Sequence, residues 1–266
     1  MLEAVLAGGF GLLIGSFLNV CIHRMPRDES VVSPRSHCPS CGQGIAWYDN
    51  IPVLSWFLLR GSCRNCRAPI SPRYPAVEFL SGVLFAAGVF AFGPGIAAVK
   101  FCVFAAAQVA LVFTDLEARI LPDEFTLGGV LAGLAFAPLV PPEFSMLVYF
   151  LPESLNVRVT ALLEAAFSAV VLAGILWGIG AIYGRLRGLE VLGFGDVKLV
   201  ACIGAFLGLG PSLLAIAAGS LIGSITGIAW ILLSGRDWRT YPLPFGTFLS
   251  IAAIGIALFR PGAWVF

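Results

Sequence analysis

Charged residues are scarce in this chain. Only 12% of its 266 residues are Asp, Glu, Lys or Arg, while 59% are hydrophobic and the mean hydropathy is +0.94. Soluble globular domains carry about a quarter charged residues, so we expect a lipid bilayer to surround most of this protein. The formal net charge of +1 offers no basic surface for a polyanion, which argues against nucleic acid as a partner.

Four common catalytic and nucleotide-binding motifs are also missing. The sequence contains no GxSxG, HExxH, GxxxxGK or GxGxxG. Their absence argues against a serine hydrolase with a nucleophile elbow, a zinc peptidase helix, a phosphate-binding loop and a dinucleotide-binding fold. Any catalytic group must therefore come from other residues.

The apolar residues gather into eight segments, each near the roughly 20 residues that a membrane helix needs. The first begins after Glu3 and has its positive charges behind it, at Arg24 and Arg27. A cleaved signal peptide has the reverse polarity, so we interpret this segment as a retained span. The sequence predicts an all-α integral membrane protein with about eight transmembrane helices, at 4–22, 75–92, 96–114, 125–141, 159–183, 197–210, 212–234 and 245–263.

Basic residues predict the orientation of these helices. Thirteen of the 16 Lys and Arg residues fall in connections on one side of the membrane, and three fall on the other, namely Lys100, Arg158 and Arg260. Loops on the cytoplasmic side carry the excess of Lys and Arg. We therefore expect a multi-pass protein of the cytoplasmic (inner) membrane, with residues 23–74 in the cytosol and both termini on the external side.

Four of the seven cysteines form two CxxC pairs within that cytosolic segment, separated by 21 residues: Cys38, Cys41, Cys63 and Cys66. Disulfides are disfavoured in a reducing compartment, whereas two CxxC turns supply the four thiolates of a tetrahedral Zn²⁺ site. Four thiolates leave no position for water, so we expect a structural zinc ion. The predicted domains are a first helix at 1–22, a small zinc-ribbon-like loop domain at 23–74 and a seven-helix membrane domain at 75–266.

Two aspartates at the cytosolic edge of the membrane are candidates for catalysis. Asp115 ends the third span, and Asp196 begins the sixth span after Gly193 and Gly195. Peptide hydrolysis by paired carboxyl groups needs one to accept a proton from water and the other to donate a proton to the carbonyl oxygen. A helix N-terminus favours the ionised form of Asp196, which suggests Asp196 as the base and Asp115 as the acid. We expect the glycines to allow unusual dihedrals and close approach of a substrate strand.

Structural alternatives exist for each acidic residue. An aspartate at a helix start is more often an N-cap than a catalyst, and Asp123, after Pro122, is explained in that way. Arg119 lies four residues after Asp115, so the two side chains can form an ordinary surface ion pair. Spacing alone therefore leaves both interpretations of Asp115 open.

Residues 193–198, Gly-Phe-Gly-Asp-Val-Lys, resemble the GxGD signature of intramembrane aspartyl proteases, and residues 114–123 resemble the partner motif of prepilin peptidases. Other segments are similar to segments of that family in the same order: 15–26, the paired CxxC loop, 50–52, 73–78 and 244–248. The resemblance to the type IV prepilin peptidase/N-methyltransferase family covers nearly the whole chain, except for an insert at about 142–158.

This resemblance implies a leader peptidase with Asp115 and Asp196 as its catalytic pair. Its substrates are type IV prepilins or type II secretion pseudopilins, which carry a basic leader before a hydrophobic helix. Members with the cysteine loop also methylate the new N-terminus from S-adenosylmethionine. The polar candidates for holding that cofactor are Asn19, Arg24, Arg73 and Glu78, which are explained equally well as topology anchors and caps.

Two alternatives to the bifunctional enzyme stay open from the sequence. One is a leader peptidase without methyltransferase activity. The other is a zinc-ribbon membrane scaffold for pilus or secretion assembly, with no catalysis at all. A scaffold tolerates the loss of both carboxylates, whereas either enzyme does not.

Overall fold

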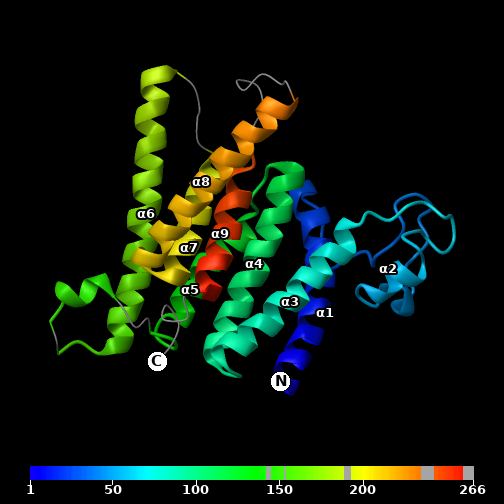
Figure 1. The fold of residues 1–266 in the computed structure, drawn as a ribbon, viewed down its shortest axis with the longest axis horizontal. Helices are drawn as coiled ribbons and strands as arrows, with labels where there is room; N and C mark the ends of the chain where they lie inside the picture. Colours follow the sequence, from blue (N-terminus) through cyan, green and yellow to red (C-terminus); the bar gives the residue numbers. More distant parts are fainter. Residues whose placement is uncertain (142–144, 153, 189–192, 235–242, 260–266) are drawn as a thin grey trace. The chain divides into compact units, whose positions relative to one another are not determined.

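In the residues that the structure describes, 1–141, 145–152, 154–188, 193–234 and 243–259, the fold is helical and contains no extended strand. The structure is a computed structural model (Figure 1). Isolated antiparallel bridges join His37 to Gly44 and Ser62 to Pro69. The elements are α1 (Leu2–Arg24), η1 (Met25–Arg27), η2 (Trp47–Asn50), α2 (Leu54–Leu58), α3 (Arg73–Phe92), α4 (Ile96–Ala118), α5 (Asp123–Phe136), η3 (Met146–Tyr149), α6 (Val157–Arg187), α7 (Phe194–Leu207), α8 (Leu209–Ser234) and α9 (Phe245–Phe259).

The predicted fold class is confirmed, because each of the eight apolar segments contains a helix. Five of these helices, α1, α3, α4, α6 and α8, are long and apolar enough to cross a membrane, and α9 is a shorter apolar helix. The number of spans stays a prediction, since α5 and α7 have only 14 residues each. Residues 260–263 of the last predicted span lie outside the described residues.

The fourth and sixth helices differ from their predicted bounds. The prediction continued the fourth to residue 141, but α5 ends at Phe136 and the chain turns before Pro141. The sixth helix starts three residues earlier than predicted and ends at Leu207, because Gly208 adopts φ +76°, which stops the helix. Hydropathy located both helices, but local backbone geometry decided their ends.

The chain divides into two compact units, Met1–Ala98 and Val99–Phe266. In the first unit, α1 packs along α3 through small residues. A Cβ atom on Gly15 would lie 2.6 Å from the Glu78 Cα atom, and one on Gly11 would lie 2.7 Å from the Ser81 carbonyl oxygen. Glycine is therefore required at both positions for the two backbones to approach so closely.

In the second unit, α7 packs against both α5 and α6 (Figure 1). A Cβ atom on Gly133 of α5 would lie 2.9 Å from the Ala205 backbone, and one on Gly204 of α7 would lie 2.9 Å from the Ser168 carbonyl oxygen. Helix α8 packs against α9, where Gly219 approaches Leu249 in the same manner. Close glycine contacts thus hold the short helix α7 in the centre of this unit.

A buried carboxylate anchors the insert that precedes α6. Glu164 is only 2% exposed and accepts hydrogen bonds from the Ser145 hydroxyl (2.9 Å), the Leu147 N–H (3.0 Å) and the Ser168 hydroxyl (3.3 Å). Its other long-range donor is the N–H of Leu209, at 3.4 Å. A buried charge is tolerated where several donors satisfy it, so Glu164 has a structural role that the sequence did not reveal.

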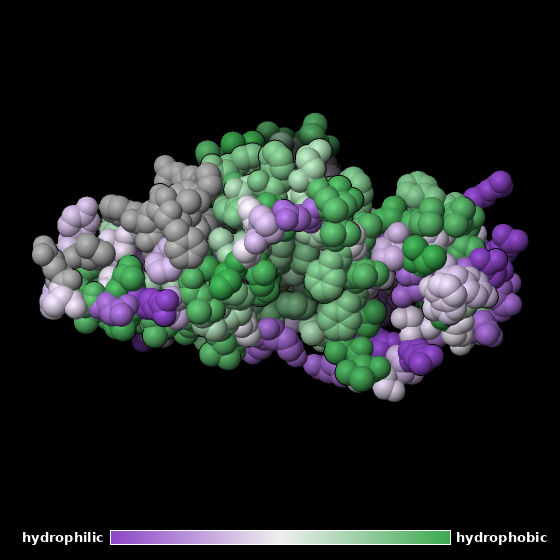
Figure 2. Space-filling view, turned by 90° about the horizontal axis from the view of Figure 1, so that it is seen from below, coloured by the Kyte–Doolittle hydropathy of each residue, from purple (hydrophilic) through white to green (hydrophobic). Residues whose placement is uncertain are grey.

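The surface of the helices is apolar. Figure 2 shows hydrophobic residues over most of the visible helical face, whereas many hydrophilic residues gather over the segment between α1 and α3. Large apolar side chains are exposed on several helices, among them Leu13, Phe79, Leu131, Val170 and Ile225. Extended apolar surface of this kind is expected where side chains face lipid, which agrees with the predicted multi-pass membrane protein.

Candidate active site and metal centre

Asp115 lies in the last turn of α4 and is only 6% exposed. Its Oδ2 atom accepts two hydrogen bonds from Thr247 in the first turn of α9: one from the main-chain N–H at 2.7 Å and one from the hydroxyl at 2.9 Å. Oδ2 can accept both of these hydrogen bonds as long as it carries no proton itself. Residues far apart in the chain therefore fix one oxygen of this carboxyl group.

Asp196 is the third residue of α7, whose N-cap is Gly193. The predicted position at a helix N-terminus is thus confirmed. Partial burial and the negative charge of Asp115 both act against a second negative charge on Asp196. The structure therefore brings the two predicted aspartates within electrostatic reach of each other.

The two carboxyl groups differ in their surroundings. Asp115 accepts two hydrogen bonds from Thr247. Asp196 lies in the first turn of α7, where the helix dipole favours a negative charge. Two acidic groups in different environments can divide the roles of proton donor and proton acceptor between them.

The glycines beside the acids do not have the predicted unusual dihedrals. Gly193 has φ −66° and ψ 134°, and Gly195 lies inside α7. Close approach explains Gly195 instead: a Cβ atom there would lie 3.3 Å from the Leu121 side chain, and one on Gly246 would lie 3.1 Å from the same side chain. Leu121 therefore packs over the backbone of both segments that carry the site.

Two structural alternatives for the acidic residues are wrong. Pro122 is the N-cap of α5, so Asp123 is its first helical residue, and Asp123 forms an ion pair with Lys198 of α7. Arg119 donates its hydrogen bond to the main-chain oxygen of Asp115 at 3.4 Å, not to the carboxylate. The Asp115 carboxylate is therefore not part of the expected surface ion pair.

The four predicted metal ligands come together in the segment between α1 and α3. The sulfur atoms of Cys38, Cys41, Cys63 and Cys66 all lie within 4.8 Å of one another. Those of Cys38 and Cys66 are 3.7 Å apart, and tetrahedral Zn²⁺ with Zn–S bonds of about 2.3 Å separates its sulfurs by about 3.8 Å. The donor set and its spacing therefore fit zinc.

Backbone N–H groups favour the thiolate form of two of these cysteines. The N–H groups of Cys66 and Asn65 lower the pKa of Cys63 to about 7, and hydrogen bonding to the Gln43 backbone lowers the pKa of Cys41. The Ala68 backbone also acts to lower the pKa of Cys66, but burial and hydrogen bonds with the neighbouring cysteines together raise that pKa to about 11. Zinc binds the thiolate form, so the CxxC turns supply the geometry and, at Cys41 and Cys63, hydrogen bonds that favour metal binding.

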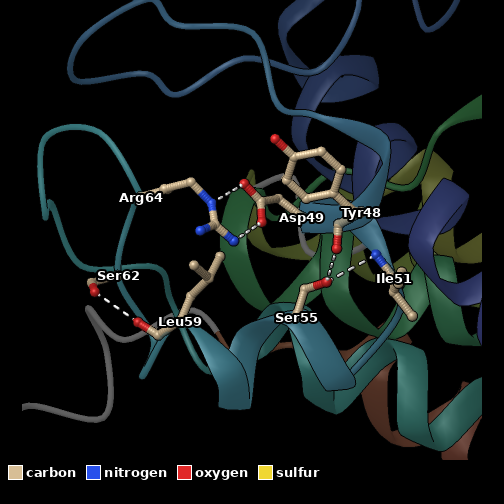
Figure 3. A network of polar contacts seen from close by, with 7 residues as sticks. All are labelled: Tyr48, Asp49, Ile51, Ser55, Leu59, Ser62 and Arg64. Carbon is tan, nitrogen blue, oxygen red and sulfur yellow. Dashed lines mark hydrogen bonds and ion pairs between the residues drawn. The ribbon is translucent and has the colours of Figure 1, made fainter.

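A polar network holds the segment that carries Cys63 (Figure 3). The Arg64 guanidinium donates to both carboxylate oxygens of Asp49, at 2.8 and 2.6 Å, which keeps the pKa of Asp49 below its usual range. The Ser55 hydroxyl donates to the Tyr48 carbonyl and accepts from the Ile51 N–H. These contacts tie η2 and α2 to the second CxxC turn.

The residues suggested for the methyl donor are largely engaged by the chain itself. Arg24 donates to the carbonyl oxygens of Ser30 and Pro34, at 2.8 Å each. Glu78 accepts the N–H of Val53 at 2.7 Å.

The two other candidates, Asn19 and Arg73, both contact Tyr74. Asn19 donates to the Tyr74 carbonyl at 3.0 Å, while its buried Oδ1 atom has no partner among the described residues. The Arg73 guanidinium lies 4.7 Å from the Tyr74 ring centroid. These contacts favour anchoring of the loop by Arg24 and Glu78, whereas the Asn19 Oδ1 atom is enclosed by the surrounding chain.

Sequence reasoning missed Thr247 and Leu121. Thr247 belongs to the segment 244–248, which resembled the family but had no assigned role, and Leu121 is an ordinary apolar residue of the loop before α5. Nothing in the local pattern indicates that either lies beside Asp115 or Gly195. Only the packing of α4, α7 and α9 brings them to the site.

Apolar helices, two neighbouring carboxyl groups and a cluster of four thiols indicate the class: a multi-pass helical membrane protein with two candidate catalytic acids and a cysteine cluster that could hold a metal ion. The family model described as the bacterial peptidase A24 N-terminal domain matches residues 10–92, and that of the type IV leader peptidase family matches residues 102–228. The chain belongs to the type IV leader peptidase family.

Several relatives carry the name prepilin leader peptidase/N-methyltransferase. The chain is 41% identical to the one from Myxococcus xanthus over 88% of its own length and 65% of that relative. Identity is 37% to the Aeromonas hydrophila protein, over 91% of this chain and 86% of the relative, and 32% to the Neisseria gonorrhoeae protein, over 97% and 91%. No solved structure matches the chain. The family resemblance expected from the motifs is confirmed.

Proposed function

We propose that this protein removes the leader peptide of type IV prepilins or type II secretion pseudopilins, with Asp115 and Asp196 as the catalytic pair. The observation that carries the proposal is that these two aspartates, from α4 and α7, lie near enough to interact electrostatically, in a chain of the type IV leader peptidase family. The similar proteins named prepilin leader peptidase/N-methyltransferase support the same substrate class.

The chemistry follows from an acid pair that shares one proton. The ionised carboxylate accepts a proton from water while the water oxygen bonds to the carbon of the scissile peptide, and the protonated partner gives its proton to the carbonyl oxygen. The tetrahedral intermediate then loses its C–N bond: the leaving amine takes one proton from the pair, while a hydroxyl of the intermediate gives its proton to the other carboxylate and becomes the new carbonyl. One water is consumed, and the pair again holds a single proton.

Carboxamide variants test this proposal. In cells that coexpress a candidate prepilin, Asp115→Asn and Asp196→Asn each abolish leader removal, because a carboxamide neither accepts nor donates the proton required. Glu29→Gln, at an exposed carboxylate of the loop after α1, retains it. Immunoblots measure the ratio of mature to precursor pilin and the amount of inserted enzyme. Retained cleavage in either aspartate variant contradicts the pair.

The second proposed activity is methylation of the new N-terminal amine, supported by the names of the relatives. S-adenosylmethionine supplies an electrophilic methyl group when bound. The unpartnered Oδ1 of Asn19 is a candidate acceptor for it, with Arg24, Arg73 and Glu78 shaping the surrounding loop. Mass spectrometry of the mature N-terminus, with or without one added methyl group, separates the bifunctional enzyme from a peptidase alone.

We assign the cysteine cluster to a structural Zn²⁺ ion, because four thiolates leave no position for water. The distribution of Lys and Arg supports a location in the inner membrane, with the acid pair near the cytosolic face and both termini outside. Within this arrangement, the predicted division into 1–22, 23–74 and 75–266 remains a proposal. A non-catalytic scaffold is the competing proposal, and it predicts full function from both carboxamide variants.

A further inference from the structure

Thr247 makes an unusually complete contact with Asp115. Its main-chain N–H and its hydroxyl both reach the same carboxylate oxygen, Oδ2, at 2.7 and 2.9 Å, and Thr247 itself is 3% exposed. Gly246, the residue before it, leaves the space that this oxygen needs, since a Cβ atom there would lie 3.3 Å from Oδ2. The start of α9 therefore supplies two hydrogen-bond donors to one oxygen of Asp115 and leaves the space that this oxygen occupies.

The other oxygen of Asp115 accepts no hydrogen bond within the described part of the chain. We propose that Thr247 is a positioning residue for the acid pair: it holds Asp115 Oδ2 in place and so presents the other oxygen, Oδ1, to the reacting groups. This inference rests on the proposed peptidase function.

The hydroxyl of Thr247 has two acceptors within reach. Oγ1 lies 2.9 Å from Asp115 Oδ2 and 3.3 Å from the Val112 carbonyl, so the shorter contact is to the carboxyl oxygen. With the N–H of Thr247 as a second donor, Oδ2 is held by two hydrogen bonds, which form whether the proton of the pair lies on Asp196 or on Asp115 Oδ1.

The charged groups around Asp115 leave its Oδ2 atom to Thr247. Asp196 of α7 lies near enough for the two carboxyl groups to interact electrostatically. Arg119, on its own helix, contacts only its main-chain oxygen, and Lys198 of α7 is paired with Asp123 of α5. From α9, the described contacts are the two neutral donors of Thr247. No described cation pairs with the Asp115 carboxylate in place of Thr247.

The test uses the full-length protein and a purified prepilin, with kcat and KM for leader cleavage measured across the pH range. Thr247→Val keeps the shape of the side chain and removes only the hydroxyl, and Thr247→Ser restores it. The matched control is Thr160→Val, because Thr160 is also buried but its hydroxyl bonds a helix carbonyl, that of Asn156.

We expect Thr247→Val to lower kcat about tenfold with KM unchanged, because Asp115 Oδ2 loses one of its two donors and the carboxyl group is held less firmly in its reacting position. Thr247→Ser restores kcat, and Thr160→Val leaves it unchanged. Each kcat is taken per folded enzyme, measured from thermal unfolding of the same preparation, so a smaller folded fraction does not imitate the loss.

An unchanged kcat in Thr247→Val, a rise in KM in place of a fall in kcat, or a loss that Thr247→Ser does not restore overturns the positioning role. Asp115→Asn and Asp196→Asn belong in the same assay. If either cleaves like the wild type, the proposed function itself fails. If both are inactive and Thr247→Val matches the wild type, only the inference about Thr247 fails.

Discussion

At the scale of single residues, the site depends as much on missing side chains as on the aspartates. Gly195 and Gly246 both face Leu121, and neither requires a positive φ. Their contribution is space: each lets the backbone lie against a neighbour that a methyl group would displace. A signature glycine can thus be explained by packing, although the sequence suggested flexible dihedrals.

Gly246→Ala tests this explanation. Its Cβ atom would lie 3.1 Å from Leu121 and 3.3 Å from Asp115 Oδ2, so the carboxylate must shift. We expect about a tenfold loss of cleavage, since roughly 1.4 kcal/mol of lost transition-state stabilisation is one factor of ten. Gly255→Ala in the same helix has open space around its Cβ and stays within about twofold of wild type. Equal rates for the two variants, measured on purified protein, contradict the packing argument.

At the scale of elements, the packing of the short helix α7 determines where Asp196 lies relative to Asp115. Its length is only 14 residues, yet nine of them are buried. The contacts of Gly204 with α6 and of Ala205 with Gly133 of α5 fix its position on two sides. The ring centroids of Phe104 in α4 and Phe206 in α7 lie 5.0 Å apart, which ties α7 to the helix that carries Asp115.

Gly204→Ala tests whether this packing positions the acid. The new Cβ would lie 2.9 Å from the Ser168 carbonyl oxygen, a main-chain atom that cannot move alone. We expect a loss of about 1–3 kcal/mol in stability and a matching loss of cleavage. Gly174→Ala in α6, where a Cβ meets nothing within 4 Å, is the control and leaves stability equal or slightly higher. Thermal unfolding in detergent measures both, and an unaffected Gly204→Ala refutes the idea that α7 requires this contact.

At the scale of the whole molecule, the two kinds of chemistry belong to different compact units. The cysteine cluster lies in Met1–Ala98 and both aspartates lie in Val99–Phe266. The two matching family models, over 10–92 and 102–228, follow nearly the same division. A metal site in one unit and an acid pair in the other predict that the two activities can be separated.

The double variant Cys38→Ser, Cys41→Ser tests this separation. We expect it to lose its zinc, measured by elemental analysis, and to lose methyl transfer by a larger factor than cleavage, because two hydroxyls do not replace two thiolates. Cys102→Ser, at a cysteine of α4 outside the cluster, keeps both the metal and the activities. Equal loss of methyl transfer and cleavage in the double variant identifies the zinc ion as a folding element for the whole protein.

The sequence by itself was enough to predict that most of the chain lies in lipid, that eight apolar segments form helices, and that four cysteines come together as candidate metal ligands. Each of these follows from local rules: a run of apolar residues has to form its hydrogen bonds within itself in lipid, and a CxxC turn brings two sulfurs together regardless of what surrounds it. It also identified Asp115 and Asp196, through motifs that lie within a few residues of each acid.

Only the tertiary structure decided the partners of those acids. Asp115 meets Thr247, which lies 132 residues later, and Leu121 covers two glycines from different helices. Such contacts depend on how helices cross, and crossing is set by the shapes of whole helix faces and not by the spacing of any one motif. The sequence thus identifies the candidate catalytic acids, while packing between distant helices determines which residues surround each of them.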